Sequence, residues 1–349
     1  MIKSFTPAVP IYCNTVRKIG KQQPLYFRTE TFAKILLDCQ NLLKYLLHCK
    51  SGKVVILTAS GTGAMDASIQ NLIDKKERIL IIVGGSFGKR WVEICQHYQL
   101  NYTIFNVDFG KNLDLHQLEN NIKLYKPTYI LSQHNETSSM QLHPIEKIGN
   151  LCKQYKIKFI VDAISSFCVD YIDMDGYNID CLVISTNKGV GTYPGLSAII
   201  LKSNMKYKKS VSYYFDFNKY IGNFGDISLP FTPNLTSIYQ LYYQLKKFKK
   251  LGIKNLIKKI HKQAIHFRTL IEKLPFTIIA ETSSNCGTGL YTERMDVKDL
   301  FERLQKQNIY FTPAGGEEGK KLIIGHIGEQ TRKDNLIIVK ELIKWLKRK

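Results

Sequence analysis

Short apolar runs alternate with longer amphipathic segments between residues 50 and 200. The runs are rich in Ile, Val and Leu, which is typical of buried strands, and the segments between them repeat apolar residues at helical spacing. The predicted strands are 53–58, 78–83, 102–107, 128–132, 158–162, 181–185 and 197–201, and the predicted helices are 63–73, 88–98, 113–122 and 145–155. This alternation predicts an α/β fold with a mostly parallel sheet between helices, in which ligands bind beyond the carboxyl ends of the strands.

The pattern changes after about residue 205. A region rich in Tyr and Lys is followed by one long helical stretch, 236–274, and then by a mixed segment with predicted strands near 276–280 and 322–325. No internal repeat of 20 to 50 residues is visible in the sequence. We therefore expect a second, smaller α+β domain after the large one.

The composition is that of an ordinary globular protein. The 349 residues are 44% hydrophobic, which is enough for a sizeable core and argues against disorder. The net charge of +21 would suit a nucleic-acid partner, but 41 of the 50 basic residues are lysines, whereas bases and phosphates are read mostly by the planar fork of arginine. Since the lysines lie along almost every predicted element, we expect solvated helix faces and no nucleic acid.

Cysteines and the N-terminal segment indicate the compartment. The eight cysteines form no C-x-x-C pair and no metal-ligand spacing with the eight histidines, so we expect no metal site. Residues 1–14 lack the apolar core of a signal peptide, and no run approaches the roughly 18 apolar residues of a membrane span. A cytoplasmic protein without a membrane partner is expected.

Residues that could bind a ligand lie at the ends of three predicted strands. A turn rich in small residues, 59–64, follows the first strand and opens a helix, as anion-binding turns do. Asp162 ends another strand, and Lys188 follows the next one. Each feature alone has an ordinary structural explanation: a tight turn, a helix cap or a surface lysine. Together they supply the parts that pyridoxal 5'-phosphate (PLP) needs: a Schiff-base lysine, a carboxylate for the pyridine nitrogen and a phosphate turn.

Short motifs in a fixed order connect these parts. They are Phe27-Arg28-Thr29-Glu30, Ser60-Gly61-Thr62, Gly85-Ser86-Phe87-Gly88-Lys89-Arg90, His134-Asn135-Glu136-Thr137-Ser138, Val161-Asp162-Ala163, Ser185-Thr186-Asn187-Lys188 and Phe231-Thr232-Pro233. From residue 5 to about 328 the sequence thereby resembles the class V aminotransferases of PLP fold type I. Within them it is most similar to 2-aminoethylphosphonate–pyruvate transaminase and alanine–glyoxylate aminotransferase. The resemblance implies a large PLP-binding domain, residues 16–248, and a small domain made of residues 1–15 and 249–349.

The resemblance also implies roles for individual residues. Lys188 corresponds to the lysine that forms the Schiff base and transfers the proton, and Asp162 to the partner of the pyridine nitrogen. Phe87 corresponds to the ring that stacks on the cofactor, and Thr137 to the donor to its phenolic oxygen. The phosphate ligands would be Ser60, Gly61, Thr62, Asn187 and, from the neighbouring subunit, Thr232. A homodimer with shared active sites is therefore expected.

One position departs from the family pattern. The family strand Arg-Ile-Gly-x-x-Gly carries an arginine that binds the substrate carboxylate, and here the matching segment starts with Ile323. An apolar side chain cannot pair with a carboxylate. Another cation must therefore bind the substrate anion, and Arg28 is our first candidate, followed by Lys320 and Lys321.

The leading hypothesis is a ping-pong aminotransferase that moves an amino group between a small anionic amine and an oxo acid. The amine would be a phosphonate, a phosphate ester or an amino acid. The alternative keeps PLP but makes the protein a decarboxylase or lyase of a small amino acid or its phosphate, because the missing arginine changes which bond is held perpendicular to the ring. A third hypothesis, supported by charge alone, is a non-enzymatic polyanion-binding protein.

Overall fold

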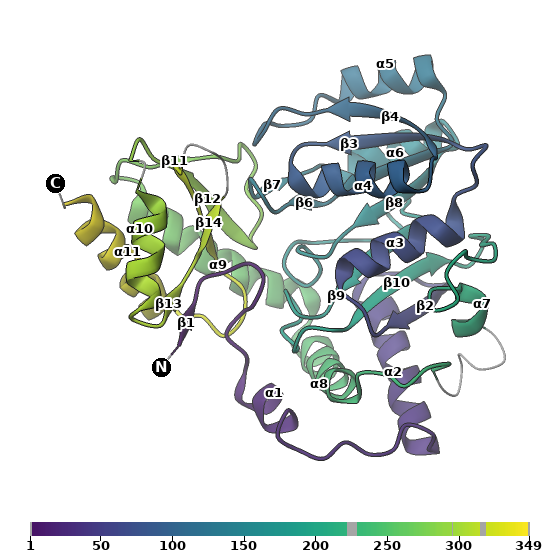
Figure 1. Cartoon of the computed structure of the whole chain (residues 1–349), viewed down its shortest axis with the longest axis horizontal. Coiled ribbons are helices and arrows are strands. Elements are labelled where there is room, and N and C mark those ends of the chain that lie inside the picture. Colours follow the sequence, from purple (N-terminus) through teal and green to yellow (C-terminus); the bar gives the residue numbers. More distant parts are fainter. Residues whose placement is uncertain (1, 222–228, 295, 315–318, 348–349) are drawn as a thin grey trace.

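The computed structural model describes residues 2–221, 229–294, 296–314 and 319–347. Figure 1 shows two units side by side. A large sheet covered by helices forms one of them, and a smaller unit, where both chain ends lie, forms the other. No helix in the described ranges has an apolar stretch long enough to cross a membrane.

The large sheet has seven strands, and their spatial order differs from their order in the chain. The order across the sheet is β2 (Gly52–Leu57), β10 (Ser197–Lys202), β9 (Cys181–Ser185), β8 (Lys158–Asp162), β5 (Tyr129–Gln133), β3 (Arg78–Val83) and β4 (Asn101–Asn106). Only β10 runs antiparallel to its neighbours. The prediction of a mostly parallel α/β sheet is therefore confirmed.

Helices cover this sheet and follow its strands in the chain. α3 (Gly61–Leu72) packs on β9 and β10, and α4 (Ser86–His97) packs on β3, β4 and β5. α5 (Leu115–Tyr125) lies on β4, α6 (Ile145–Gln154) on β8 and α2 (Glu30–Leu46) on β2. The short elements α1 (Asn14–Ile19), β6 (Asn135–Glu136), β7 (Gln141–Leu142) and α7 (Phe217–Tyr220) complete the large unit. Buried strands between helices explain why the strands read as continuous apolar runs.

The smaller unit is built on an antiparallel sheet of order β11 (Thr277–Ile278), β12 (Gly287–Tyr291), β15 (Lys321–Gly325) and β14 (Thr312–Ala314). The helices α10 (Val297–Gln305) and α11 (Arg332–Leu346) belong to it. The first strand of the chain, β1 (Lys3–Ser4), pairs in parallel with β13 (Ile309–Tyr310). The first strand of the chain thus lies in the C-terminal unit, and the bounds 16–248 for the large domain and 1–15 with 249–349 for the small one stay a prediction.

The helical stretch expected over 236–274 is present, but Gly252 divides it into two helices. α8 (Leu235–Leu251) ends at Gly252, and α9 (Ile253–Ile271) begins directly after it. Gly252 has a φ of +81°, a left-handed conformation that glycine adopts without the steric penalty of a side chain. The apolar periodicity continues across the break, so the glycine was the only local sign of it.

The structure has two hydrophobic cores, one mainly in each unit. One contains the strands of the large sheet, and the other contains Phe5, Phe311 and Trp345. α9 contributes to both, with Leu256 in the first core and Phe267 in the second. Because one continuous helix lies in both cores, it is a rigid connection between the two units.

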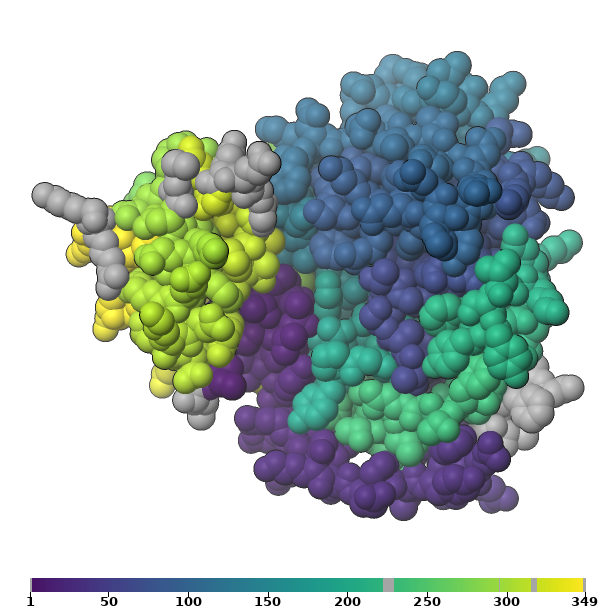
Figure 2. All heavy atoms as spheres, viewed as in Figure 1, coloured from purple at the N-terminus to yellow at the C-terminus, as the bar shows by residue number. Residues whose placement is uncertain are grey.

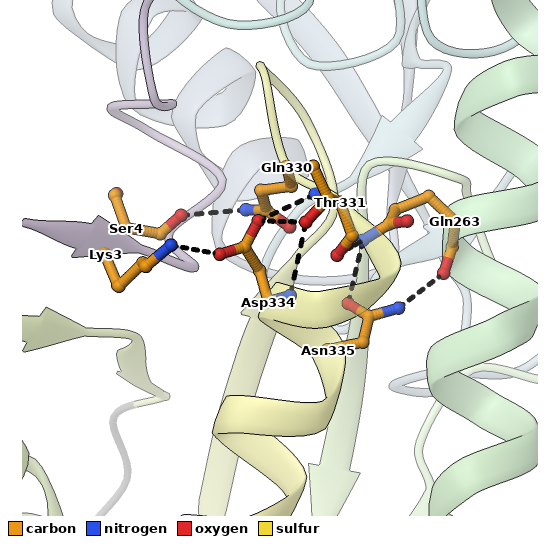
Figure 3. A network of polar contacts seen from close by, with 7 residues as sticks. All are labelled: Lys3, Ser4, Gln263, Gln330, Thr331, Asp334 and Asn335. Atoms are coloured by element: carbon orange, nitrogen blue, oxygen red, sulfur yellow. Dashed lines mark hydrogen bonds and ion pairs between the residues drawn. The ribbon is translucent and has the colours of Figure 1, made fainter.

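A polar network fixes the N-terminal strand to the smaller unit (Figure 3). The Lys3 ammonium pairs with Asp334, which also accepts hydrogen bonds from Thr331 in a capping box at the start of α11. Gln330 donates to the Ser4 carbonyl at 2.8 Å. In Figure 2 the N-terminal segment, shown in purple, lies against the smaller unit and then runs along the lower edge of the larger one. This path brings the first residues past the junction between the units.

Candidate active site

The candidate site lies at the carboxyl edge of the large sheet. Asp162 is the last residue of β8, and Lys188 lies three residues after the end of β9. These strands are parallel neighbours, so their carboxyl ends share one edge. The helices α3 and α4 begin at this edge, which brings their N-termini to the same site.

Lys188 is half-buried and faces an aromatic ring. Its Nζ lies 5.3 Å from the centroid of the Phe87 ring. Burial lowers the pKa of the Lys188 ammonium, and the nearby Cys286 and Asp162 oppose this effect. In the described part of the chain no carboxylate lies within ion-pair distance of Lys188. A buried amine with a lowered pKa is a better nucleophile than a solvated lysine.

Asp162 is a buried carboxylate with one oxygen bound by the chain. Only 5% of the residue is exposed, and its Oδ1 accepts a hydrogen bond of 2.8 Å from the Ile164 amide. Burial raises its pKa to about 6, although the Ile164 amide and the Lys188 charge oppose the shift. No described group donates a hydrogen bond to Oδ2. Asp162 therefore offers a free acceptor to a cationic ligand group.

The pKa of Asp162 predicts a cost to the cofactor-free protein. A carboxyl whose pKa rises from 3.8 to about 6 on folding binds more protons in the native state, so stability falls as pH rises from about 4 to about 6. In urea unfolding without cofactor at pH 8, we expect the free energy of unfolding of Asp162→Asn to exceed that of the wild type by up to about 3 kcal/mol. At pH 5 the difference should shrink by about half or more. An equal difference at both pH values would contradict this origin of the effect.

Glu136, which the sequence did not single out as a site residue, fixes the start of α4. It is fully buried on β6 and accepts hydrogen bonds from the amides of Phe87 (3.2 Å) and Gly88 (3.0 Å). Ser138 also donates to it, through both its amide and its hydroxyl. Gly85 makes room for this carboxylate, since a Cβ there would come within 2.7 Å of Glu136 Cδ. Glu136 therefore holds the backbone that carries the Phe87 ring.

Thr137 lies beside a small hydroxyl network. Its Oγ1 donates to Ser165 Oγ at 2.8 Å, and Asn135 Nδ2 donates to the same oxygen at 3.1 Å. All three residues are buried. The arrangement keeps the Thr137 hydroxyl close to the segment that follows Asp162, where its proposed role requires it.

The predicted phosphate turn forms the start of α3. Ser60 is the N-cap, and its hydroxyl accepts from the Gly63 amide at 3.2 Å. A Cβ at Gly61 would come within 2.5 Å of Ile164, so glycine allows α3 to pack against the segment after Asp162. Among the described residues, the amides of Gly61 and Thr62 have no hydrogen-bond acceptor. Free amides at a helix N-terminus favour an anion.

Asn187 links the site to the N-terminal segment. Its Nδ2 donates to the Ala8 carbonyl at 3.0 Å, and its Oδ1 accepts from Ser185 at 2.5 Å. Residues 6–12 therefore run close to the lysine loop, and Tyr12 packs edge-on against Tyr193 at 4.9 Å. The sequence gave no sign of this contact, because its partners lie about 180 residues apart.

Two candidate residues stand apart from the site of their own chain. Arg28 is exposed and lies over the Phe27 ring at 5.4 Å, and Thr232 is exposed. Neither has a recorded contact with Lys188, Asp162 or the turn in the described residues.

The residue that departs from the family pattern, Ile323, is buried between two strands. Ile323 lies on β15 between Gly289 and Thr312, is 3% exposed and belongs to the larger core. Lys320 pairs with Glu293 at 3.2 Å, and Lys321 lies over the Phe109 ring at 4.9 Å. The two lysines thus have other partners, which weakens them as ligands of the substrate anion.

The residues of this site fit PLP. A half-buried amine, a carboxylate with a free oxygen, an aromatic ring and free helix amides converge at one sheet edge, and each matches one chemical group of the cofactor. Within the described ranges no three His, Cys, Asp or Glu side chains are arranged to hold a metal ion. Arg90, on α4 one turn after Phe87, also lies here and was not assigned a role from the sequence.

Comparison with known proteins agrees with this geometry. The family model for aminotransferase class-V matches residues 20–292. Alanine–glyoxylate aminotransferase of Callithrix jacchus is 26% identical over 346 residues, which cover 93% of this chain and 82% of that protein. The 2-aminoethylphosphonate–pyruvate transaminase of Phocaeicola vulgatus is 29% identical over 160 residues, 45% of this chain and 44% of that protein.

The fold agrees with these relatives. The structure of an alanine–glyoxylate aminotransferase from Nostoc sp. superimposes with a TM-score of 0.93 at 22% identity and covers 99% of this chain and 95% of its own. The prediction of PLP fold type I is thereby confirmed, and the family and its fold are PLP-dependent in general. The chain belongs to the class V aminotransferase family.

Proposed function

We propose that this protein binds PLP through Lys188 and transfers an amino group from a small anionic amine to an oxo acid. The observation that carries the proposal is the meeting of Lys188, Phe87 and Asp162 at one sheet edge, with the amine 5.3 Å from the ring centroid. Transamination is the reaction of the family, and the decarboxylase or lyase alternative is not favoured.

Each residue has a separate task in this reaction. When bound, PLP supplies a reactive carbonyl and an electron sink. Lys188 would form the link to the cofactor and would accept and release a proton at its Nζ, because burial lowers the pKa of its ammonium. The free oxygen of Asp162 would accept a hydrogen bond from the protonated pyridine nitrogen, and the Thr137 hydroxyl, which donates to Ser165 in this structure, would turn to donate to the phenolic oxygen. Phe87 keeps the ring plane fixed and excludes water from one face.

We expect the anionic group of the substrate amine to bind away from the strand that contains Ile323. Ile323 is buried among apolar residues, and an unpaired carboxylate there would cost several kcal/mol. We therefore propose an amine without an α-carboxylate, or one whose anion another cation binds. A spectroscopic test mixes the PLP-loaded protein with alanine or with 2-aminoethylphosphonate in the absence of an oxo acid: faster bleaching of the visible absorbance by the phosphonate supports the proposal. Release of carbon dioxide without amino transfer would support a decarboxylase instead.

A homodimer explains why Arg28 and Thr232 stand apart from the site. Both are exposed, and neither contacts the site of its own chain in the described residues. We propose that Thr232 of one subunit binds the cofactor phosphate of the other and that Arg28 binds the substrate anion there. The proposed compartment is the reducing cytoplasm, where the eight free cysteines would remain thiols.

Shared sites predict complementation between two defective subunits. Lys188→Ala dimers should be inactive, and Arg28→Gln dimers should show a KM for the anionic amine raised by about 10- to 100-fold. In a mixed dimer, one site combines an intact Lys188 with an intact Arg28 from the other chain. Mixing and refolding the two variants should therefore restore a wild-type KM to part of the population. If the mixture shows only the raised KM of Arg28→Gln, Arg28 does not act across the interface.

A further inference from the structure

Arg90 is an arginine at the site without an anionic partner. It follows Phe87 by one turn of α4, and its guanidinium lies 4.7 Å from the centroid of the Phe87 ring. Its Nη1 donates to Thr62 Oγ1 at 3.1 Å, which connects α4 to the start of α3. The side chain is half-buried, and it reaches from the aromatic ring to the predicted phosphate turn.

The charge of Arg90 is not compensated within the described residues. No described carboxylate lies within ion-pair distance of its guanidinium. Of its five N–H donors, one is satisfied by Thr62, and no other described acceptor takes one. Partial burial of an unpaired cation is unfavourable unless a ligand supplies the missing charge. The charge of Arg90 also opposes the rise in the pKa of Asp162 and adds to the lowering of the pKa of Lys188.

We propose that Arg90 binds the phosphate of PLP, together with Thr62 and the free amides at the start of α3. This inference rests on the proposed function and adds a ligand to it. The Thr62 hydroxyl accepts from Arg90, so its own proton remains free to donate to a phosphate oxygen. The planar guanidinium can donate two parallel hydrogen bonds to a phosphate, and the helix N-terminus adds its partial positive charge.

The position of Arg90 favours the cofactor phosphate over the substrate anion. Its hydrogen-bond partner among the described residues, Thr62, is the second residue of α3, and the amides of Thr62 and Gly61 have no acceptor in the same part of the chain. The substrate anion already has a proposed ligand, Arg28 of the partner subunit. Arg90 is the fifth residue of α4, a helix of the larger unit.

The test compares PLP with pyridoxal, which lacks the phosphate. Cofactor-free wild type, Arg90→Gln, Arg90→Lys and Lys89→Gln are titrated with each compound, and binding is followed by the visible absorbance of the adduct with Lys188. Lys89 is the matched control, since it is the preceding lysine on the same helix and is exposed. Arg90→Gln should raise the Kd for PLP by about 10- to 100-fold and leave that for pyridoxal unchanged. Arg90→Lys should lie between, and Lys89→Gln should match the wild type.

Inorganic phosphate provides a second readout without the covalent link. Phosphate should compete with PLP for the wild type and should compete much more weakly for Arg90→Gln. The inference is overturned if Arg90→Gln binds PLP as the wild type does, including the case in which only the KM for an anionic amine rises. It is also overturned if the affinities for PLP and pyridoxal fall together, since the arginine would then only support the Phe87 ring. A wild type that forms no adduct with either compound would instead refute the proposed function.

Discussion

Replacing Lys188 by alanine should lower the rate of amino transfer by at least about 10,000-fold. The variant loses the amine that bonds the cofactor and the group that moves the proton, and no second lysine with a recorded contact to Phe87 replaces it in the described residues. The measurement is single-turnover amino transfer, followed by absorbance. In the wild type, borohydride reduction followed by peptide mapping should place the cofactor on Lys188.

The control for this variant is Lys202→Ala. Lys202 ends β10, the antiparallel strand beside β9, and therefore lies at the opposite edge of the sheet. Its loss should leave turnover near that of the wild type. Wild-type turnover in Lys188→Ala, or a reduced adduct on a different lysine, would contradict the assignment.

Asp162→Ala should slow amino transfer by about 100- to 5,000-fold, while the protein still folds. The substitution removes the buried charge that holds a proton on the pyridine nitrogen, and loss of one member of such a pair costs about 3 to 5 kcal/mol. Steady-state kinetics at saturating PLP measure the loss, and circular dichroism checks the fold.

Asp180→Asn is the matched control for Asp162→Ala. Asp180 is 8% exposed and accepts from the Phe159 amide just before β9, at the amino edge of the same sheet. If the catalytic defect came from removing any buried carboxylate of the sheet, this variant would share it. Turnover per folded molecule should instead be unchanged. Near-normal activity of Asp162→Ala with bound cofactor would rule out its assigned role.

The parts of the fold that the sequence predicted are those with local signals. The bounds of β3, β8 and β9 match the predicted strands, because each is a short run of buried apolar residues that ends at a polar residue or before a pair of glycines. In the smaller unit the strands expected near 276–280 and 322–325 are present as β11 and β15, but β1 and β12 were not predicted. β12 carries two glycines and has no apolar alternation, and β1 has only two residues, whose partners lie about 300 positions away. Long-range pairing of this kind leaves no local pattern.

The sequence predicted those site residues that lie at or just after the end of an apolar strand. Asp162 and Lys188 each follow an apolar strand, and the structure brings both to one edge of the sheet. Glu136 and Arg90 were not recognised, because their roles depend on contacts with another element: Glu136 with the amides of α4, and Arg90 with Thr62 on α3. A carboxylate four residues beyond the predicted apolar strand 128–132 was the one available sign of Glu136.

The pairing of the first strand with β13 has a consequence for synthesis in the cell. β13 is translated about 300 residues after β1, a delay of roughly 15 to 60 s at roughly 5 to 20 residues per second. During that time Phe5, which is fully buried in the finished core, has no partner strands to cover it. The smaller core therefore closes last, when the N-terminus returns to the end of the chain. Products that stop before residue 309 should keep this apolar end exposed and should be preferred substrates for chaperones and proteases.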